Sequence, residues 1–339
     1  MKKSLSIFLI MVLAVSLFFT GCGQPAEQEN PADKGENGEP QGEKPGETLE
    51  LAFATGGTSG TYYPLGGAIA NIWNKSIEGV NVTIQPAGAS VENINRVASG
   101  EVDIVLAMNN IADDAFNGTG KSFSQPLKNF KAVGVVYPEV MHVVTTQASG
   151  IKSIADLKGK SINPGPPGSG TYVTAMKILE AYGIGPKDYT AKPGSFSDAV
   201  AGLKDGNIDA AFAVLSFPAS AVKEIATTNP VKILSIDGAE FDAVKELVPF
   251  AAKFPIKGGE YKGQDTDATT VTLQAVMYVK EDLSDDLVYE LTKIMYENTE
   301  EISQGHARGK QIKLENAISG VTTPIHPGAQ KYYNEKGIK

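Results

Sequence analysis

The amino-acid sequence predicts an α/β protein built from two units of similar plan. Three short motifs each occur twice, in the same order and at similar spacing along the 339 residues. They stand where apolar, strand-like runs alternate with helical patterns, and such alternation is typical of parallel α/β sheets. The motif pairs are Ser59-Gly60-Thr61-Tyr62 and Ser169-Gly170-Thr171-Tyr172, Gln85 to Ser90 and Lys192 to Ser197, and Gly100 to Ile104 and Gly206 to Ala210.

Residues 1–21 are predicted to be an export signal and not part of the fold. Lys2 and Lys3 precede an apolar run over residues 5–19, which is too short and too early for an ordinary membrane span. The run ends at Phe19-Thr20-Gly21-Cys22, which resembles the lipobox of bacterial lipoproteins with Phe19 where leucine is usual. Cys22 is the only cysteine, so we expect it to carry a lipid anchor and expect no disulfide. The alternative is an unmodified thiol in a disordered tail.

Residues 22–47 are predicted to form a disordered tether. From Gly23 to Glu47 the chain has five glycines, four prolines, seven acidic residues and no aromatic or β-branched residue. Such a segment cannot bury enough apolar surface to offset the entropy of ordering. The formal net charge is −9 at pH 7, and the remaining body has no basic excess, so we expect no nucleic-acid partner. That body is long enough for two hydrophobic cores.

The first unit begins with an alternating strand over residues 49–54. A glycine-rich turn follows, and then a helix whose apolar stripe includes Tyr62, Leu65 and Trp73, so Trp73 is expected in the core. Next come a strand over residues 80–84 and a helix that Ser90 is expected to cap. The near-continuous apolar run over residues 102–107 is typical of a buried parallel strand.

The second unit repeats this order. A short strand over residues 161–163 precedes a helix over 171–182, and a helix that Ser197 is expected to cap precedes a strand over 208–215. Two apolar strands, over residues 140–144 and 271–279, fit neither unit alone. We expect them to cross between two lobes as hinge strands. The predicted domains are residues 48–142 plus 275–339 for lobe 1 and residues 143–274 for lobe 2.

The two Ser-Gly-Thr segments are the main candidates for a binding site. At the start of a helix the first amide N–H groups have no intrahelical partner, and the helix dipole favours negative charge. Glycine allows close approach of a ligand, and hydroxyl groups add donors. Two such helix starts facing one cleft would bind a small anion, although the hydroxyls could instead only cap their own helices. The residues expected in the site are Thr58, Ser59, Gly60, Thr61, Tyr62, Ser169, Gly170 and Thr171.

The ends of buried strands add further candidates. Asn109 follows the buried strand that ends at Ala107, and Ser216 follows the strand that ends at Leu215. Ligands of α/β sheets bind at the carboxyl ends of strands. Asn109 could equally be a turn residue. Gly88 and Ser90, at the start of the second helix, complete the expected site. Glu139 could meet a ligand ammonium, but a surface carboxylate is the favoured interpretation.

Catalytic, metal and nucleotide motifs are not found. The glycine-rich segment 165–171 lacks the lysine of a phosphate-binding loop. Arg96 and Arg308 are the only arginines; the first is expected in solvent and the second in a polar loop, so a bidentate clamp has no good candidate. Three scattered histidines form no metal motif, and no nucleophile elbow is present. We therefore expect no catalytic residue, no metal and no cofactor.

Several blocks resemble one known family. Gly56 to Ala70 resembles the opening signature of the TAXI solute receptors, the extracytoplasmic binding proteins of one branch of TRAP (tripartite ATP-independent periplasmic) transporters. One departure is that Met108 and Asn110 stand where the family often has Gln and Asp, which weakens the case for an amino-group ligand and leaves a plain carboxylate open. The resemblance extends from about residue 49 to the C-terminus, with similar blocks at Ala87 to Asn93, Tyr137-Pro138-Glu139, Pro167 to Thr171 and Pro324 to Ala329.

The resemblance implies a bilobal type II periplasmic-binding-protein fold, with two parallel-type sheets flanked by helices and joined by hinge strands. It implies a non-catalytic receptor that captures a small carboxylate, either a glutamate-like amino acid or a related organic acid. The receptor would deliver this ligand to an integral-membrane TRAP permease driven by an ion gradient. It would be exported and lipid-anchored, at the outer face of the cytoplasmic membrane or in the periplasm. The alternatives are an enzyme on the same fold and a ligand-sensing module without transport.

Overall fold

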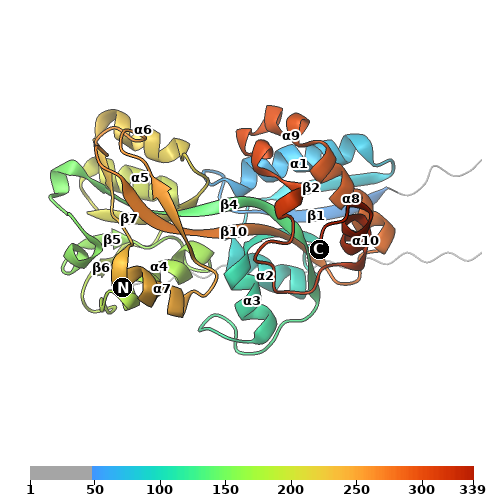
Figure 1. Cartoon of the computed structure of the whole chain (residues 1–339), viewed down its shortest axis with the longest axis horizontal. Helices are drawn as coiled ribbons and strands as arrows, with labels where there is room; N and C mark the ends of the chain where they lie inside the picture. The colour runs from blue at the N-terminus through green and yellow to red at the C-terminus, as the bar shows by residue number, and fades with distance from the viewer. Residues whose placement is uncertain (1–47) are drawn as a thin grey trace, which may run out of the picture. The chain divides into compact units, whose positions relative to one another are not determined.

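The computed structural model describes residues 48–339, and Figure 1 shows how their helices and strands are arranged. The predicted export signal, the predicted lipid attachment at Cys22 and the predicted tether lie outside the described residues. Among residues 48–339, no helix is both long enough and apolar enough to cross a membrane.

The first lobe combines segments from both ends of the described chain. Its outer strands pair in parallel in the order β2-β1-β3. Trp73 is fully buried, and its indole Nε1 donates a hydrogen bond of 2.9 Å to the Leu291 carbonyl of a C-terminal helix. The elements are β1 (Leu49–Ala54), α1 (Tyr62–Ser76), β2 (Val80–Gln85), α2 (Ser90–Ala98), β3 (Ile104–Met108), α3 (Asn109–Asn117), α8 (Asp285–Glu297), α9 (Thr299–Gly305) and α10 (Pro327–Lys336).

The second lobe is formed by the middle of the chain. Its outer strands pair in parallel in the order β6-β5-β7, as in the first lobe. The elements are β5 (Ser161–Asn163), α4 (Gly170–Ala181), β6 (Thr190–Ala191), α5 (Phe196–Asp205), β7 (Ala210–Leu215), α6 (Ser220–Thr228), β8 (Val231–Ile233), α7 (Gly238–Leu247) and β9 (Ala252–Ile256).

Two helix caps differ from the sequence prediction. The cap of α5 is Ser195 and not Ser197, because Ser195 and Asp198 form a reciprocal capping box at the helix start. Ser90 is the first residue of α2, and its hydroxyl does not cap that helix. Instead Ser90 Oγ accepts a hydrogen bond from the backbone N–H of Met108 at the end of β3.

Two long strands, β4 (Phe130–Thr146) and β10 (Ala268–Lys280), run through both lobes (Figure 1). In the first lobe β10 lies between β3 and β4 and is antiparallel to both. In the second lobe β4 is antiparallel to β7 and β8, and β10 is antiparallel to β9. The strands therefore form one continuous sheet in the order β2-β1-β3-β10-β4-β7-β5-β6. The short 3₁₀ segments are η1 (Gln147–Ser149), η2 (Ile154–Leu157), η3 (Ala307–Gln311) and η4 (Leu314–Asn316).

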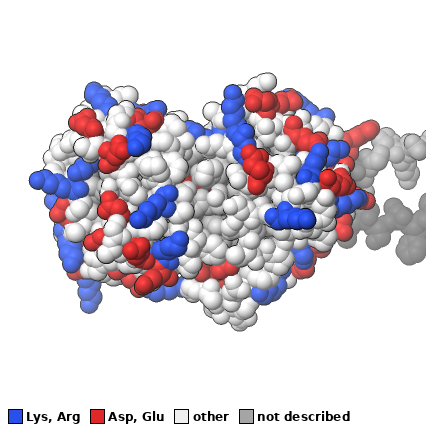
Figure 2. Space-filling model, in the orientation of Figure 1, with Lys and Arg blue, Asp and Glu red and all other residues white. Residues whose placement is uncertain are grey.

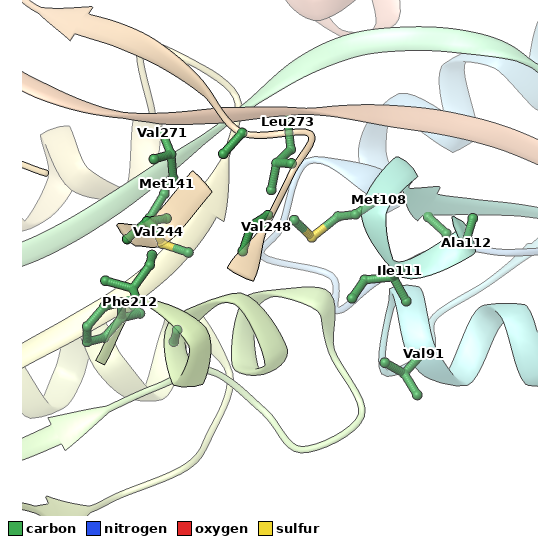
Figure 3. Close-up of a cluster of buried hydrophobic side chains, with 14 of the residues drawn as sticks. Val91, Met108, Ile111, Ala112, Met141, Phe212, Val244, Val248, Val271 and Leu273 are labelled. Carbon is green, nitrogen blue, oxygen red and sulfur yellow. The ribbon is translucent and has the colours of Figure 1, made fainter. Parts of the chain in front are cut away.

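The hydrophobic core has one part in each lobe and one part that joins them. One cluster packs α1, α8 and α10 against the first-lobe strands, and another packs α5 and α6 against β7. A third cluster is continuous from the first lobe to the second (Figure 3). It includes Met108 and Ile111 on one side, Phe212 and Val244 on the other, and Leu273 of β10.

The predicted fold class is confirmed: the chain has a bilobal α/β architecture of the type II periplasmic-binding-protein kind, with helices around the strands. The outer strands are parallel, as predicted, and antiparallel pairing occurs where β4 and β10 enter. The proposed lobe division after residues 142 and 274 stays a prediction, since β4 and β10 are continuous through it.

Candidate functional site

Two neighbouring cavities lie where the lobes meet. Their empty volumes are about 350 and 520 Å³. Gly60, Thr171 and Val214 line both cavities. The first cavity is also lined by Gly56, Thr61, Tyr62, Ser90, Met108, Tyr137 and Glu139. The second is also lined by Gly57, Ser59, Gly165, Pro166, Ser169, Ser195, Phe196, Phe212, Ala213 and Leu215.

The start of α1 contributes a polar contact between the lobes. Thr61 Oγ1 donates to Ser216 Oγ over 3.2 Å and accepts from the Ser216 backbone N–H over 3.3 Å. Ser216 follows β7 in the second lobe, so these two bonds join the first Ser-Gly-Thr segment to the opposite lobe. The N–H of Tyr62, at the first position of α1, has no acceptor within residues 48–339.

The start of α4 presents free amides beside the same cavities. Ser169 Oγ accepts from the Tyr172 N–H over 3.0 Å and donates to the Pro166 carbonyl over 2.7 Å. This hydroxyl is therefore a helix cap, which is the alternative that the sequence left open. The N–H groups of Gly170 and Thr171 find no acceptor in the described part of the chain. Because they lie in the first turn, they carry the positive end of the helix dipole.

The start of α2 is held by the opposite lobe. The Gly168 carbonyl, in the loop before α4, accepts from the Val91 and Glu92 N–H groups over 3.1 and 3.2 Å. A carbonyl oxygen thus occupies the position at α2 that an anion could take. Immediately before this helix, Ala89 has φ 70° and ψ −148°, a conformation that is rare outside glycine.

The first cavity contains one buried carboxyl, Glu139 of β4. Its side chain is 3% exposed, and it accepts from the Tyr62 hydroxyl at Oε2 over 3.1 Å and from the Tyr137 hydroxyl at Oε1 over 3.4 Å. Burial raises the pKa of Glu139 to about 8, and the two tyrosine hydrogen bonds oppose this rise in pKa. The interpretation of Glu139 as a surface carboxylate is therefore wrong. Glu139 lies between two apolar runs of the sequence, over residues 132–136 and 140–144, and this is the signal that could have revealed its burial.

Five residues of the predicted site line neither cavity: Thr58, Gly88, Asn109, Gly170 and Ser216. Thr58 is exposed in the turn before α1. The Gly88 N–H donates to Glu92 Oε2 over 3.0 Å. Asn109 starts α3 and ties the backbone together, since its amide group accepts from Gln274 N over 3.2 Å and donates to the Gly320 carbonyl over 3.0 Å.

The remaining predicted residues, with Gly170 and Ser216, come together at the lobe junction. Gly60, Thr61, Tyr62, Ser90 and Thr171 line the first cavity, and Ser59 and Ser169 line the second. Gly170 packs against them: a Cβ added there would collide with Met108 Sδ and lie 2.9 Å from Ser90 Oγ. Ser216 joins through its bonds to Thr61. Whether these residues bind a ligand stays a prediction.

Arg308 has a different place from the one expected. The sequence predicts a polar loop at this residue, but Arg308 is partly buried, and Nη1 and Nη2 donate to the Phe217 and Pro218 carbonyls over 2.6 Å each. Both nitrogens therefore bind backbone oxygens that directly follow Ser216. The guanidinium fixes this loop, and it is not among the residues that line the two cavities.

The remaining ionisable groups near the junction are structural. His142 of β4 is fully buried, with Nδ1 bonded to the Val140 carbonyl over 3.0 Å and Nε2 to the Tyr261 hydroxyl over 2.9 Å. Burial lowers the pKa of His142 to about 4, so its ring is neutral near pH 7. Within residues 48–339, no group of three or more histidine, cysteine or acidic side chains could hold a metal.

Charge is sparse around the junction on the visible face. Figure 2 shows lysine, arginine and acidic side chains intermixed over both lobes, whereas the middle of that face is mostly uncharged. No lysine or arginine side chain is among those that line either cavity. A bound anion would therefore meet amides and hydroxyls at these walls.

Comparison with known proteins gives one family and a set of distant structures. The sequence profile of the NMT1-like family matches residues 53–337. Among solved structures, a putative L-cystine ABC transporter protein from Listeria monocytogenes is 14% identical, with a TM-score of 0.48 over 79% of this chain and 98% of its own. The alkanesulfonate-binding protein of Xanthomonas axonopodis pv. citri, bound to MOPS, is 12% identical, with a TM-score of 0.47 over 86% and 91%. These identities and scores imply nothing about the ligand of this chain.

Proposed function

The chain belongs to the NMT1-like family, and from this premise we propose that it is an extracytoplasmic receptor for a small carboxylate. The observation that carries the proposal is the cavity between the lobes, which is bordered by the first turns of α1 and α4. Tyr62 and Thr171, one from each lobe, line this cavity and have free backbone N–H groups, and Gly170 next to Thr171 has another. A small anion that accepts from both helix starts would hold the lobes together.

The donors at this site are uncharged. Each helix start stabilises a nearby anion by about 0.3–1 kcal/mol at an exposed position and more where water is excluded. Tyr62 and Ser90, which line the cavity, are both buried. The affinity would therefore come from several weak, well-oriented contacts and not from one guanidinium clamp.

We further propose that the receptor delivers its ligand to a TRAP permease in the membrane. The support is the resemblance of Gly56 to Ala70 and of the block at Tyr137-Pro138-Glu139 to the TAXI receptors. A lipid on Cys22 and a tether over residues 22–47 would keep the receptor beside that permease. Catalysis is not part of the proposal.

Isothermal titration calorimetry of the purified full-length chain tests the binding function. We expect saturable one-to-one binding of at least one acid from a panel of succinate, L-glutamate, 2-oxoglutarate, L-alanine, L-lactate and pyruvate. Thr171 lines both cavities, and its Oγ1 accepts from the Val214 N–H over 3.3 Å, which leaves its O–H free to donate to a ligand. Thr171→Val removes this hydroxyl while keeping the side-chain shape, and it should weaken the binding by roughly 3- to 10-fold.

The matched control is Thr227→Val. Thr227 lies at the exposed end of α6, where its hydroxyl donates to the Glu224 carbonyl. This variant should bind the same acid with unchanged affinity. If no acid of the panel binds to the wild-type chain, the proposed function is wrong.

A further inference from the structure

Within residues 48–339, the buried carboxyl of Glu139 in the first cavity has no cationic partner. Glu139 is the only acidic side chain among the residues that line this cavity, and the lining includes no lysine or arginine. Both of its oxygens already accept hydrogen bonds, from Tyr62 and Tyr137. When Glu139 is ionised, each of the two hydroxyl groups can donate to one of its oxygens.

The groups around Glu139 do not supply the missing positive charge. The titratable side chains that face it are Tyr62 from α1, Tyr137 from its own strand and Tyr278 from β10. Arg308 of η3 comes near Tyr137, but its two terminal nitrogens bind backbone carbonyls of the second lobe. A buried carboxylate without a cation is costly.

We propose that Glu139 binds an ammonium group of the ligand and thereby selects amino acids over hydroxy and keto acids of the same skeleton. This inference rests on the proposed function, because it assumes that a small carboxylate occupies the first cavity. An ammonium completes the pair that the protein leaves open, and two tyrosine hydroxyls hold the carboxylate in position for it.

The same cavity presents acceptors for a cation and donors for an anion. Glu139 lines it together with Thr61, Tyr62 and Thr171, which belong to the starts of α1 and α4. A small ligand that meets both kinds of group carries an ammonium and a carboxylate only a few bonds apart, which is the arrangement of an α-amino acid. The substrate class is therefore zwitterionic.

This conclusion revises the expectation drawn from the sequence. Asn110 stands where the resembling family often has an acid, and this weakened the case for an amino-group ligand. In the structure Asn110 lies in the first turn of α3 and lines neither cavity. The acid that faces the cavity comes from β4 instead, through Glu139.

Binding of an ammonium at Glu139 changes the protonation of the protein. Since burial raises the pKa of this carboxyl to about 8, most molecules hold a proton on Glu139 at pH 7 when no cation is near. The proton leaves to the buffer as the ammonium arrives, and an ammonium–carboxylate pair forms. The affinity for an amino acid should then rise by up to about tenfold per pH unit from pH 6 to 8.

Calorimetry with matched ligands tests this role. The probes are L-glutamate, 2-hydroxyglutarate and 2-oxoglutarate, and L-alanine, L-lactate and pyruvate, at pH 7 in phosphate and in Tris. In at least one of the two series we expect the amino acid to bind roughly 10- to 100-fold more tightly than its analogues, with release of about one proton per ligand. Glu139→Gln should abolish both the preference and the proton release.

The control is Glu101→Gln, which changes an exposed acid that pairs with Arg96. It should keep the wild-type preference and proton release. Equal or tighter binding of the hydroxy or keto acids, or an unchanged preference in Glu139→Gln, would overturn the role of Glu139 while leaving the proposed function intact. Absence of binding by these six acids and by succinate would instead contradict the proposed function.

Discussion

At the scale of single residues, Ala89 carries backbone strain beside the site. Its φ of 70° with ψ of −148° is a conformation that glycine adopts readily and alanine does not. The residue precedes the first turn of α2, where two amides meet the Gly168 carbonyl and Ser90 lines the first cavity. With this conformation the first turn of α2 faces the opposite lobe, where its two amides bond to the Gly168 carbonyl.

Ala89→Gly should stabilise the protein. Relief of the strained conformation contributes about 1–3 kcal/mol, and the greater freedom of glycine in the unfolded chain removes about 0.4–1 kcal/mol of this. We expect a net gain of about 1 kcal/mol in the free energy of unfolding, measured by urea denaturation. Ala98→Gly, at the helical end of α2, should instead destabilise by about 0.5–1 kcal/mol. A loss of stability in Ala89→Gly would contradict the assignment of strain.

The hydrogen-bond partners of Glu139 illustrate what a sequence could not reveal at this scale. An isolated acidic residue is most often exposed, and nothing in the local pattern shows that Tyr62, distant by 77 positions, donates to it. By contrast, the burial of Trp73 followed from its position on the apolar stripe of a helix. Local periodicity predicts which side of a helix is buried, whereas a partner from another element depends on how distant strands and helices meet.

At the scale of elements, repeated strand–helix order made the two lobes predictable. The starts of α1 and α4 lie where the Ser-Gly-Thr segments indicated, at Tyr62 and Gly170. The two apolar strands that fitted neither unit proved to be β4 and β10, which run through both lobes. β4 begins at Phe130, ten residues before the expected strand over residues 140–144. This extension could not be predicted, because the strands that pair with it lie far away in the sequence.

The contact between α4 and the first lobe depends on a glycine. Gly170 is buried at the first position of α4, and a Cβ at this position would collide with Met108 Sδ at the end of β3. The same added Cβ would lie 2.9 Å from Ser90 Oγ. Because α4 must approach β3 this closely for its free amides to border the first cavity, the glycine is required by packing and not by its φ angle.

Gly170→Ala should therefore weaken ligand binding without unfolding the protein. The added methyl group would keep the start of α4 away from Met108 and prevent the lobes from meeting fully around the ligand. We expect at least about a tenfold loss of affinity in calorimetry, with a change in melting temperature of only a few degrees. Gly185→Ala, where a Cβ would only approach Asp188 Oδ2 at 3.5 Å, should bind normally. Wild-type affinity in Gly170→Ala would contradict this account of the contact.

At the scale of the whole molecule, the two lobes touch through polar and apolar contacts together. Thr61 bonds to Ser216, α2 receives the Gly168 carbonyl, and Lys177 pairs with Asp114 over 3.2 Å with both side chains about one-fifth exposed. A single hydrophobic cluster also continues across the junction (Figure 3). The contacts that hold the lobes together therefore also contribute to folding stability. Groups buried at the junction should affect both the stability and the contact between the lobes.

Two buried ionisable groups at this junction change the folding stability in opposite directions as the pH changes. Burial lowers the pKa of His142 from 6.5 to about 4, so the unfolded chain binds the extra proton first and stability falls as the pH decreases from 6.5 to 4. Burial raises the pKa of Glu139 from 4.5 to about 8, so the folded chain retains a proton that the unfolded chain loses. Its contribution therefore falls as the pH rises from 4.5 to 8.

The melting temperature of the chain without added ligand should consequently decline between pH 6.5 and 8. In that window His142 stays neutral and no longer makes the free energy of unfolding depend on pH. Glu139 changes this free energy by up to about 1.4 kcal/mol per pH unit. Glu139→Gln, which stays neutral, should remove the decline and be more stable than the wild type at pH 8, as measured by differential scanning fluorimetry. Glu101→Gln should keep the wild-type decline, because that side chain is exposed. Parallel profiles of the wild type and Glu139→Gln across this window would show that the carboxyl of Glu139 is already ionised in the folded protein.

A residue that binds ligand at the cost of stability should show both effects in one variant. Glu139→Gln should therefore be more stable than the wild type without ligand and should bind amino acids more weakly.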